Sequence, residues 1–275
     1  MDNQSFWTIF SLAFFLSFCG TVWSEEPETA APGKQVVETI ELPASTSTWD
    51  YIDGIRLIGE PRPVDDTKTE TVRYWLYLPL DYEQAVAIDG APLFLFLHGA
   101  GERGSEPDEI SKVKVHGPPK LLDKPEFQKH WPCVTVSPQC KRGFAWSPEQ
   151  LFLLLDAVEK KYKVDKKRVY VSGLSMGGFG TWMLLQAEPE RFAAAAAICG
   201  GAKPQWAPKL VNVPIWVFHG NKDNVVPCKL SEIIVDAVRK AGGCKIILTV
   251  FEDVGHDSWV AAYDNQLLYD WMFAQ

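Results

Sequence analysis

The sequence has little of what would indicate a nucleic-acid partner, a metal or a redox centre. It contains no run of basic residues, and its formal net charge of −8 argues against nucleic acid and an anionic membrane surface as partners. No Cys-x-x-Cys spacing occurs, so a zinc site or a redox motif has no support. There are also no internal repeats. We therefore predict no metal or organic cofactor, and the sequence says nothing about oligomeric state.

What the chain does contain is typical of a globular protein. It has 275 residues, of which 47% are hydrophobic and 23% are charged. This balance excludes a disordered or fibrous protein. A chain of this length can bury one sizeable core.

The N-terminus is expected to be a targeting segment. Residues 6–22 are almost all apolar, but the run is too short and too terminal for a membrane span. We interpret residues 1–24 as a signal peptide cleaved before Glu25, which predicts a secreted or periplasmic protein without stable membrane insertion. An uncleaved anchor is the alternative, because the first five residues carry no basic side chain. Cys19 does not indicate a lipoprotein, since bulky Phe18 precedes it.

Residues 25–50 are rich in Glu, Pro, Ala, Thr and Ser, a composition that buries little surface. We predict a flexible tether over 25–50, within which Gln35–Leu42 could instead add an edge strand. Residues 51–275 are then the globular domain. Outside Cys19 the cysteines are odd in number, so at least one thiol is unpaired. We expect buried thiols, with a Cys133–Cys140 disulfide as the alternative.

Apolar runs alternate with helical periods along the rest of the chain. Because this alternation is typical of parallel sheets with right-handed crossovers, we predict an α/β fold with helices on both faces of a mostly parallel sheet. The expected strands are Val72–Leu78, Pro92–Leu97, Cys133–Ser137, Arg168–Ser172, Ala193–Cys199, Pro214–His219 and Lys245–Phe251. The expected helices are Pro148–Lys161, Met176–Glu188, Leu230–Ala241 and Ser258–Phe273. Ligands bind such sheets at the carboxyl ends of the strands.

Ser175 is the candidate nucleophile. It lies in a Gly-x-Ser-x-Gly pattern formed with Gly173 and Gly177, directly between a predicted strand and a predicted helix. A serine on such a turn needs small neighbours, and the turn exposes its hydroxyl at the helix N-terminus. The alternative is a phosphate-binding turn, which this segment does not favour because it has neither a P-loop lysine nor a dinucleotide-binding glycine pattern.

His256 is the candidate base, because it follows the last predicted strand and a loop there can reach back over the sheet. Asp223 follows the preceding strand and is the candidate acid that orients the imidazole. Asp253 and Asp257 are rivals by sequence proximity, although they are too close along the chain to support the ring from behind. The order Ser, Asp, His is that of α/β-hydrolases.

The other histidines have less support as catalytic groups. We interpret His98 and His219 as loop-structuring residues because each lies in a strand-ending His-Gly pair, and His130 as structural. His116 could line the cleft.

Acyl transfer also needs two backbone N–H groups where negative charge develops. Met176, directly after the nucleophile, supplies one. The glycine-rich loop at 98–101 supplies the other, through Ala100 or, failing that, Gly101. The alternative is an ordinary glycine-rich turn.

With these segments the chain resembles the α/β-hydrolase superfamily, specifically secreted esterases and predicted peptidases near the dienelactone hydrolases, feruloyl esterases and polyhydroxybutyrate depolymerases. The segments that carry the resemblance are LFLHGAGERG (95–104), HGPPKLL (116–122), VSPQC (136–140), RVYVSGLSMGGFGTW (168–182), PERFAAAAAICGG (189–201), VFHGNKDNVVP (217–227) and DVGHDSW (253–259). The resemblance implies a serine hydrolase with Ser175 as nucleophile, His256 as base and Asp223 as orienting acid. It also implies Ala100 and Met176 as the oxyanion hole.

We expect an open cleft without a large lid domain, because only about a dozen residues separate Gly201 from the next strand. His116, Gln139, Trp146 and Trp259 are the candidate substrate contacts. The predicted function is cleavage of short-chain, aryl or carbohydrate-linked esters, with a small-molecule or polymer-linked ester as substrate. Two alternatives stay open: a serine peptidase of the same fold, and a non-catalytic binding protein on a hydrolase scaffold.

Overall fold

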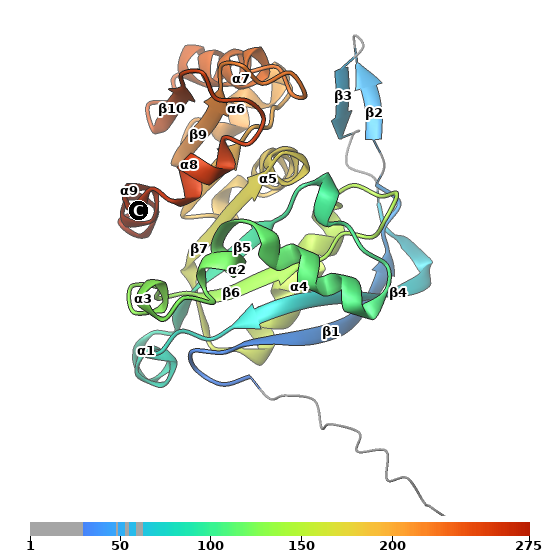
Figure 1. Cartoon of the computed structure of the whole chain (residues 1–275), viewed down its shortest axis with the longest axis vertical. Helices are drawn as coiled ribbons and strands as arrows, with labels where there is room; N and C mark the ends of the chain where they lie inside the picture. Colours follow the sequence, from blue (N-terminus) through green and yellow to red (C-terminus); the bar gives the residue numbers. More distant parts are fainter. Residues whose placement is uncertain (1–29, 48, 53–54, 59–62) are drawn as a thin grey trace, which may run out of the picture.

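The computed structural model describes residues 30–47, 49–52, 55–58 and 63–275. Most of its strands form one sheet in the order β1-β4-β6-β5-β7-β8-β9-β10 (Figure 1). The strands of this sheet are β1 (Gln35–Ala44), β4 (Asp65–Tyr77), β5 (Ala91–Leu97), β6 (Val134–Pro138), β7 (Val164–Leu174), β8 (Ala194–Ile198), β9 (Ile215–Gly220) and β10 (Ile246–Phe251). A separate antiparallel hairpin consists of β2 (Trp49–Ile52) and β3 (Ile55–Ile58).

The sheet is mostly parallel, as the alternation of strands and helices predicts. The pairs from β6 through β10 are all parallel, whereas β4 is antiparallel to both β1 and β6. The predicted α/β architecture with a mostly parallel sheet is therefore confirmed. Because β5, β7, β8, β9 and β10 run in one direction, their carboxyl ends meet at one edge.

Helices cover both faces of the sheet because its central strands are apolar on both sides. All seven residues of β5 are buried, and alternate ones belong to different cores. Leu95 and Leu97 pack in the core that includes α4 (Pro148–Lys161), α5 (Met176–Ala187) and α7 (Lys229–Lys240). Phe94 and Phe96 pack in the core that includes α2 (Gly117–Leu121), α8 (Trp259–Tyr263) and α9 (Gln266–Phe273). This two-sided burial explains the continuous apolar run in the sequence.

The remaining helical segments are short. They are α1 (Tyr82–Ile88), α3 (Pro125–Gln128), α6 (Ala207–Leu210), η1 (Ala100–Glu102), η2 (Pro107–Val115), η3 (Pro189–Arg191) and η4 (Pro204–Trp206). The connection between β8 and β9 contains only η4 and α6, so it holds no large lid. The loop from Gly101 to Leu122 contains most of η1, all of η2 and α2.

One predicted helix is wrong in extent. The segment Ser258–Phe273 forms two helices, α8 and α9, rather than one. The break occurs where the side chain of Asn265 accepts a hydrogen bond from Leu267 N at 3.1 Å and caps α9. An N-cap side chain satisfies backbone donors that a continuous helix would use internally, and so starts a new helix.

The predicted tether over 25–50 needs correction. Residues Gln35–Ala44 form β1, an edge strand paired with β4 along ten register positions. The alternative, an edge strand over Gln35–Leu42, is therefore confirmed, and the strand extends two residues further, to Ala44. Val36 and Leu42, on one face of β1, are buried, and these contacts attach the segment to the sheet. The predicted signal peptide at 1–24 lies outside the described residues.

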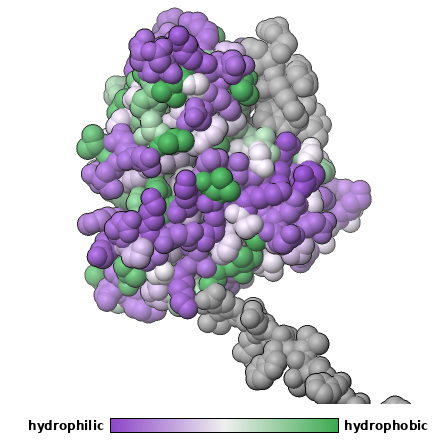
Figure 2. Space-filling view, viewed as in Figure 1, coloured by the Kyte–Doolittle hydropathy of each residue, from purple (hydrophilic) through white to green (hydrophobic). Residues whose placement is uncertain are grey.

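The described cysteines are free thiols. Cys133, Cys140 and Cys199 are buried as expected, whereas Cys228 is half-buried and Cys244 is exposed. The alternative Cys133–Cys140 disulfide is not formed. On the face shown in Figure 2, hydrophilic side chains predominate and apolar ones are scattered, consistent with the charge of the sequence.

Candidate active site

Ser175 lies on a tight turn between β7 and α5. Its backbone φ of 52° lies in the left-handed region, which residues other than glycine rarely adopt. The N–H of Ser175 donates a hydrogen bond to Ile198 O at 2.9 Å. The flanking glycines are required by space. A Cβ on Gly177 would lie 1.9 Å from Leu97 O, and one on Gly173 would lie 2.3 Å from Gly177 O. The Gly-x-Ser-x-Gly pattern therefore allows the strand, the turn and the helix to approach one another.

The structure brings the three predicted catalytic side chains together. His256 Nε2 lies 2.9 Å from Ser175 Oγ, and His256 Nδ1 lies 2.7 Å from Asp223 Oδ2. The three residues follow β7, β9 and β10, at the carboxyl edge of the sheet. The rival Asp253 instead pairs with Lys222 at 3.3 Å and is exposed. This row of hydrogen bonds can move a proton from a hydroxyl to an imidazole.

Asp223 is held on all sides. Its Oδ1 accepts the backbone N–H groups of Val225 and Val226, each at 2.9 Å. Its Oδ2 accepts from His256 and also from Nε2 of the buried His219, at 3.1 Å. Burial by itself raises the pKa of Asp223, but these hydrogen bonds outweigh it and lower the pKa below the usual value. The carboxylate thus stays charged at neutral pH.

The role of His219 goes beyond the predicted structuring of its own loop. Its Nε2 faces two acceptors, Asp223 Oδ2 and Val226 O at 2.9 Å, so this nitrogen carries the proton. Its Nδ1 lies 2.7 Å from Ser231 Oγ on α7. His219 therefore connects the orienting acid to the helix behind it, a contact that no motif in the sequence indicates.

The two predicted oxyanion donors begin helical segments beside Ser175. Met176 is the first residue of α5 and Ala100 is the first residue of η1. The N–H of a first helical residue has no acceptor within its own helix, so it is available to another group. Gly99 brings the second segment close, because a Cβ there would lie 3.6 Å from Ser175 Cβ. Gly101, the fallback donor, is the second residue of η1.

His98 holds this loop as a neutral imidazole. Its Nδ1 lies 2.6 Å from Gly99 O, and its Nε2 accepts the N–H of Cys140 at 3.0 Å. Burial lowers the pKa of His98 to about 4, so the ring is uncharged and Nδ1 carries the proton. The ring packs 4.8 Å from that of Trp146, whose Nε1 donates to His98 O at 3.2 Å. The predicted loop-structuring role matches these contacts.

Two of the four candidate substrate contacts lie beside the catalytic residues. The ring of Trp259 is 5.3 Å from that of His256, and also 5.3 Å from that of His116. His116 in turn lies 4.0 Å from the carboxylate of Glu102. Burial lowers the pKa of His116, partly opposed by Glu102. Glu102 was not predicted as a site residue.

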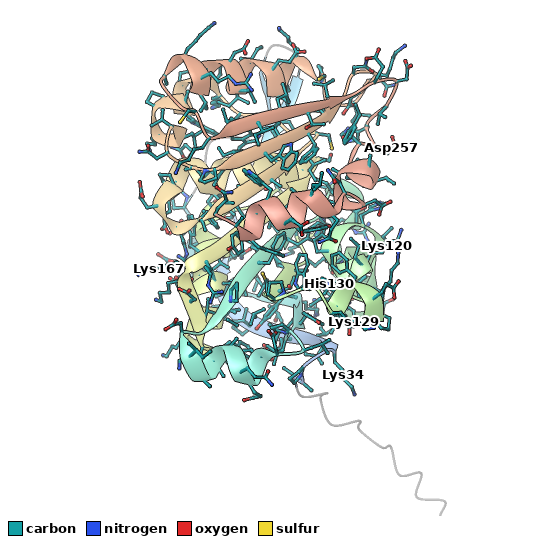
Figure 3. The ribbon with its side chains drawn as sticks, turned by 90° about the vertical axis from the view of Figure 1, so that its left-hand side faces the viewer. Lys34, Lys120, Lys129, His130, Lys167 and Asp257 are labelled. Carbon is teal, nitrogen blue, oxygen red and sulfur yellow. The ribbon has the colours of Figure 1, made fainter. Side chains whose placement is uncertain are left out.

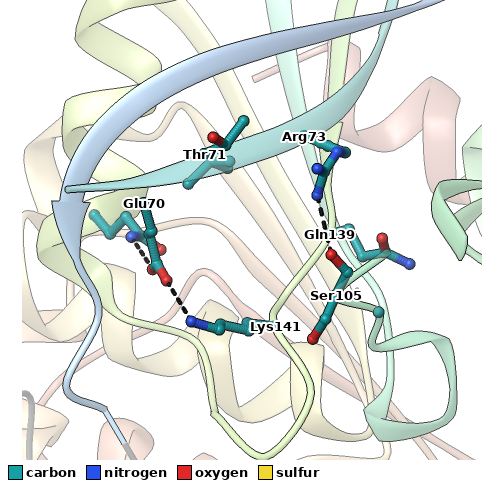
Figure 4. Close-up of a pocket in the computed structure, with 9 residues that line it drawn as sticks. Glu70, Thr71, Arg73, Ser105, Gln139 and Lys141 are labelled. Atoms are coloured by element: carbon teal, nitrogen blue, oxygen red, sulfur yellow. Dashed lines mark hydrogen bonds and ion pairs between the residues drawn. The ribbon is translucent and has the colours of Figure 1, made fainter. Parts of the chain in front are cut away.

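The other two candidate contacts hold segments of the protein itself. Trp146 is only 4% exposed and belongs to the core, because its indole N–H finds the carbonyl of His98. Gln139 donates to Glu102 O at 2.9 Å and to Glu109 O at 2.7 Å, so its amide holds the loop. It lines a polar crevice of about 230 Å³, shown in Figure 4, to which none of the three predicted catalytic residues contributes. The labelled residues of that crevice are Glu70, Thr71, Arg73, Ser105, Gln139 and Lys141.

Comparison with known proteins agrees with this geometry. Residues 146–266 match the model of the dienelactone hydrolase family. A thermostable esterase of known structure is 32% identical and superimposes with a TM-score of 0.66, over 77% of this chain and 61% of that one. The chain has the α/β-hydrolase fold.

Further similar proteins carry related names. A bifunctional acetylxylan esterase/xylanase of Neocallimastix patriciarum is 39% identical over 74 residues, which are 26% of this chain and 11% of that protein. A ferulic acid esterase is 18% identical with a TM-score of 0.60, over 88% of this chain and 99% of that one, and so is similar in fold. The chain thus spans less than two thirds of the length of the first two relatives. The relatives named here are hydrolases of the carboxylesterase type.

Neither a metal site nor a membrane helix is found in the described part of the chain. Among residues 30–47, 49–52, 55–58 and 63–275, no group of three His, Cys, Asp or Glu side chains could hold a metal ion. No helix in the same ranges is long and apolar enough to cross a membrane.

Proposed function

We propose that the chain is a secreted serine carboxylesterase that cleaves short-chain, aryl or carbohydrate-linked esters through Ser175, His256 and Asp223. The observation that carries the proposal is the row of two hydrogen bonds, 2.9 and 2.7 Å long, that joins the three side chains. Proton transfer needs this geometry first, and a charged acid behind the imidazole second. The lowered pKa of Asp223 supplies the second condition.

The mechanism follows from the positions of these groups. Neutral His256 takes the proton of Ser175 as Oγ attacks the ester carbonyl. The N–H groups of Met176 and Ala100 stabilise the oxyanion that forms, aided by the N-terminus of α5. The imidazolium, stabilised by Asp223, then protonates the departing alcohol. Water repeats the sequence on the acyl-enzyme and releases the acid.

The substrate class is part of the proposal. The absence of a large insertion between β8 and β9 in the described chain favours an open cleft, which suits an ester attached to a polymer as well as a small ester. The name of the acetylxylan esterase supports carbohydrate-linked esters in particular. Secretion rests on the apolar run at residues 6–22.

Hydrolysis of nitrophenyl esters of graded acyl length by the full chain tests the proposal, with Ser175→Ala measured alongside. Turnover that needs Ser175 and favours short chains supports it. A folded protein that turns over no ester and resists a fluorophosphonate probe overturns it in favour of a binding protein. Probe labelling of Ser175 without ester turnover favours the serine peptidase.

A further inference from the structure

Glu102 and His116 face each other without a hydrogen bond. Glu102 Oε1 and His116 Nε2 are 4.0 Å apart, beyond hydrogen-bonding distance. The other carboxylate oxygen, Oε2, is buried and has no partner in the described part of the chain. The two side chains are 14% and 28% exposed, so both are largely withdrawn from solvent. Glu102 is therefore a largely withdrawn carboxylate with unused bonding capacity, and its Oε1 can gain a hydrogen bond when a ligand brings a donor between the two side chains.

The pair lies against the catalytic residues. A Cβ on Gly99 would be 3.0 Å from Glu102 Oε2 and 3.6 Å from Ser175 Cβ, so the carboxylate and the nucleophile adjoin the same point. On the other side, the ring of Trp259 lies 5.3 Å from both His116 and His256. Glu102, His116, Trp259 and His256 therefore form a continuous wall beside Ser175.

The position of this wall indicates which part of the substrate it meets. In the proposed mechanism His256 hands its proton to the departing alcohol, so the alcohol lies next to His256. Trp259 and then His116 extend from His256 along the same wall. Glu102 and His116 are thus placed to contact the alcohol part of the ester rather than the acyl part.

We propose that Glu102 and His116 together bind a hydroxyl group on the alcohol part of the substrate, adjacent to the scissile ester. A hydroxyl both donates and accepts: it donates to Glu102 Oε1 and accepts from His116 Nε2–H. An oxygen about 2.8 Å from each atom fits across a 4.0 Å gap. This assignment rests on the proposed function and narrows it to esters of polyhydroxy alcohols that keep a free neighbouring hydroxyl.

Space for the rest of such an alcohol lies beyond the pair. A recess of about 150 Å³ is lined by His116, Lys120, Lys124, Trp259 and Asp264, among others. Its lining mixes an indole and the apolar side chains of Leu121 and Val260 with charged side chains, so it can take a polyhydroxy group together with its carbon frame. Figure 3 places Lys120 on α2 and Asp257, the neighbour of His256, along the same side of the molecule.

Two acetate esters of equal size test the assignment. 2-Hydroxyethyl acetate carries a hydroxyl on the second carbon of its alcohol part, where propyl acetate carries a methyl group. We expect kcat/KM, corrected for the alkaline hydrolysis rate of each ester, to favour the hydroxy ester by about tenfold, as one charge-assisted hydrogen bond allows. Acetate release is followed by pH titration of the reaction.

Variants then assign the preference to its residues. Glu102→Gln and His116→Phe keep side-chain size and should each bring the ratio of the two kcat/KM values close to one. Glu126→Gln and His130→Phe change the same residue types at exposed positions and should leave the ratio unchanged. Fluorophosphonate labelling of Ser175 and circular dichroism establish that each variant is folded.

The outcomes separate this assignment from the proposed function. If neither ester is hydrolysed and the probe does not label Ser175, the proposed function fails and the assignment with it. If both esters are hydrolysed at equal corrected rates, or if Glu102→Gln retains the wild-type preference, the esterase stands and the hydroxyl site is overturned.

Discussion

The two sides of the candidate active site differ in how their polar groups are bonded. On the side of Asp223, every carboxylate oxygen has at least two donors, from His219, His256 and backbone N–H groups. On the side of Glu102, one oxygen has no partner and the other is 4.0 Å from His116. Asp223 reaches Ser175 through His256, and Glu102 adjoins Gly99 next to Ser175, yet only Asp223 has both carboxylate oxygens fully hydrogen-bonded.

This contrast teaches how one pocket can separate reactivity from selectivity. A fully bonded acid keeps the imidazole in one orientation before any substrate arrives, so no reorganisation is needed during the reaction. An acid with unused bonding capacity gains interactions only when a ligand brings a donor. Changes on the first side should therefore alter kcat for all esters, and changes on the second side should alter the choice among esters.

The largest effect is expected from the nucleophile. Ser175→Ala should lower kcat by about 10⁴-fold or more, because the acyl-enzyme cannot form. Its circular dichroism should match the wild type, since the methyl group fits the same turn. Ser111→Ala on η2, an exposed serine, serves as the control and should retain full turnover. Substantial turnover by the alanine variant would mean that another group attacks the ester.

The next largest effect tests the saturated acid. Asp223→Asn should lower kcat by about 10³- to 10⁴-fold, because an amide neither stabilises the imidazolium nor holds the required tautomer. Asp253→Asn, the exposed rival, should stay within about twofold, as expected for a surface change. Equal losses in the two variants would transfer the orienting role away from Asp223. Initial rates on one nitrophenyl ester suffice for the measurement.

The third prediction concerns stability and pH. His98 has a folded-state pKa of about 4, below its ordinary value of 6.5, so the folded protein binds this proton less tightly than the unfolded chain. The contribution of neutral His98 to the free energy of unfolding should therefore be fully present at neutral pH, and it should fall as the pH drops from 6.5 towards 4. The loss between pH 7 and pH 5 from this group is about 2 kcal/mol.

Urea unfolding of the wild type and of His98→Asn at both pH values measures this loss. The variant should be less stable at pH 7 and show a smaller difference between the two pH values. If the difference is the same in both proteins, other groups are responsible for the acid sensitivity.

The smallest effect distinguishes two tryptophans that the sequence treats alike. Trp146→Phe should lower the free energy of unfolding by about 1.5 kcal/mol, because it removes buried surface and the hydrogen bond to His98 O. Trp259→Phe should change the KM for bulky esters and leave the free energy of unfolding nearly unchanged, because this ring lies beside His256. Thermal unfolding together with steady-state kinetics on both variants makes the comparison. A shift of KM in Trp146→Phe alone would reverse the two assignments.

Much of the fold and of the triad could be predicted from the sequence, because local pattern and local chemistry coincide there. Five of the seven apolar runs became strands within one residue of their expected limits, whereas β4 and β7 begin seven and four residues earlier than expected. Pro148–Lys161 became a helix with those bounds. Ser175, Asp223 and His256 each follow a strand, and parallel strands bring their carboxyl ends to one edge. Glycines around Ser175 mark the turn directly.

What could not be predicted depends on contacts between distant segments. The segment Gln35–Ala44 could be predicted only as a possible edge strand, because its pairing with β4 joins segments some thirty residues apart. Trp146 and Gln139 follow a strand end, as site residues do, but their side-chain N–H groups donate hydrogen bonds to backbone carbonyls of the protein. A sequence does not show which carbonyls will lie within reach. Glu102 carries no motif of its own, and only the approach of Gly99 to Ser175 reveals where its carboxylate lies.

The different exposure of the thiols makes it possible to measure local unfolding around Ser175. Cys244 is exposed, whereas Cys199 is fully buried and its sulfur accepts the N–H of Ser175 at 3.3 Å. A thiol reagent added to the native protein should therefore modify Cys244 at once and Cys199 only when the turn that carries Ser175 opens. The rate at which Cys199 is modified, with the site located by peptide mass, therefore measures the rate of local unfolding of the turn that carries Ser175.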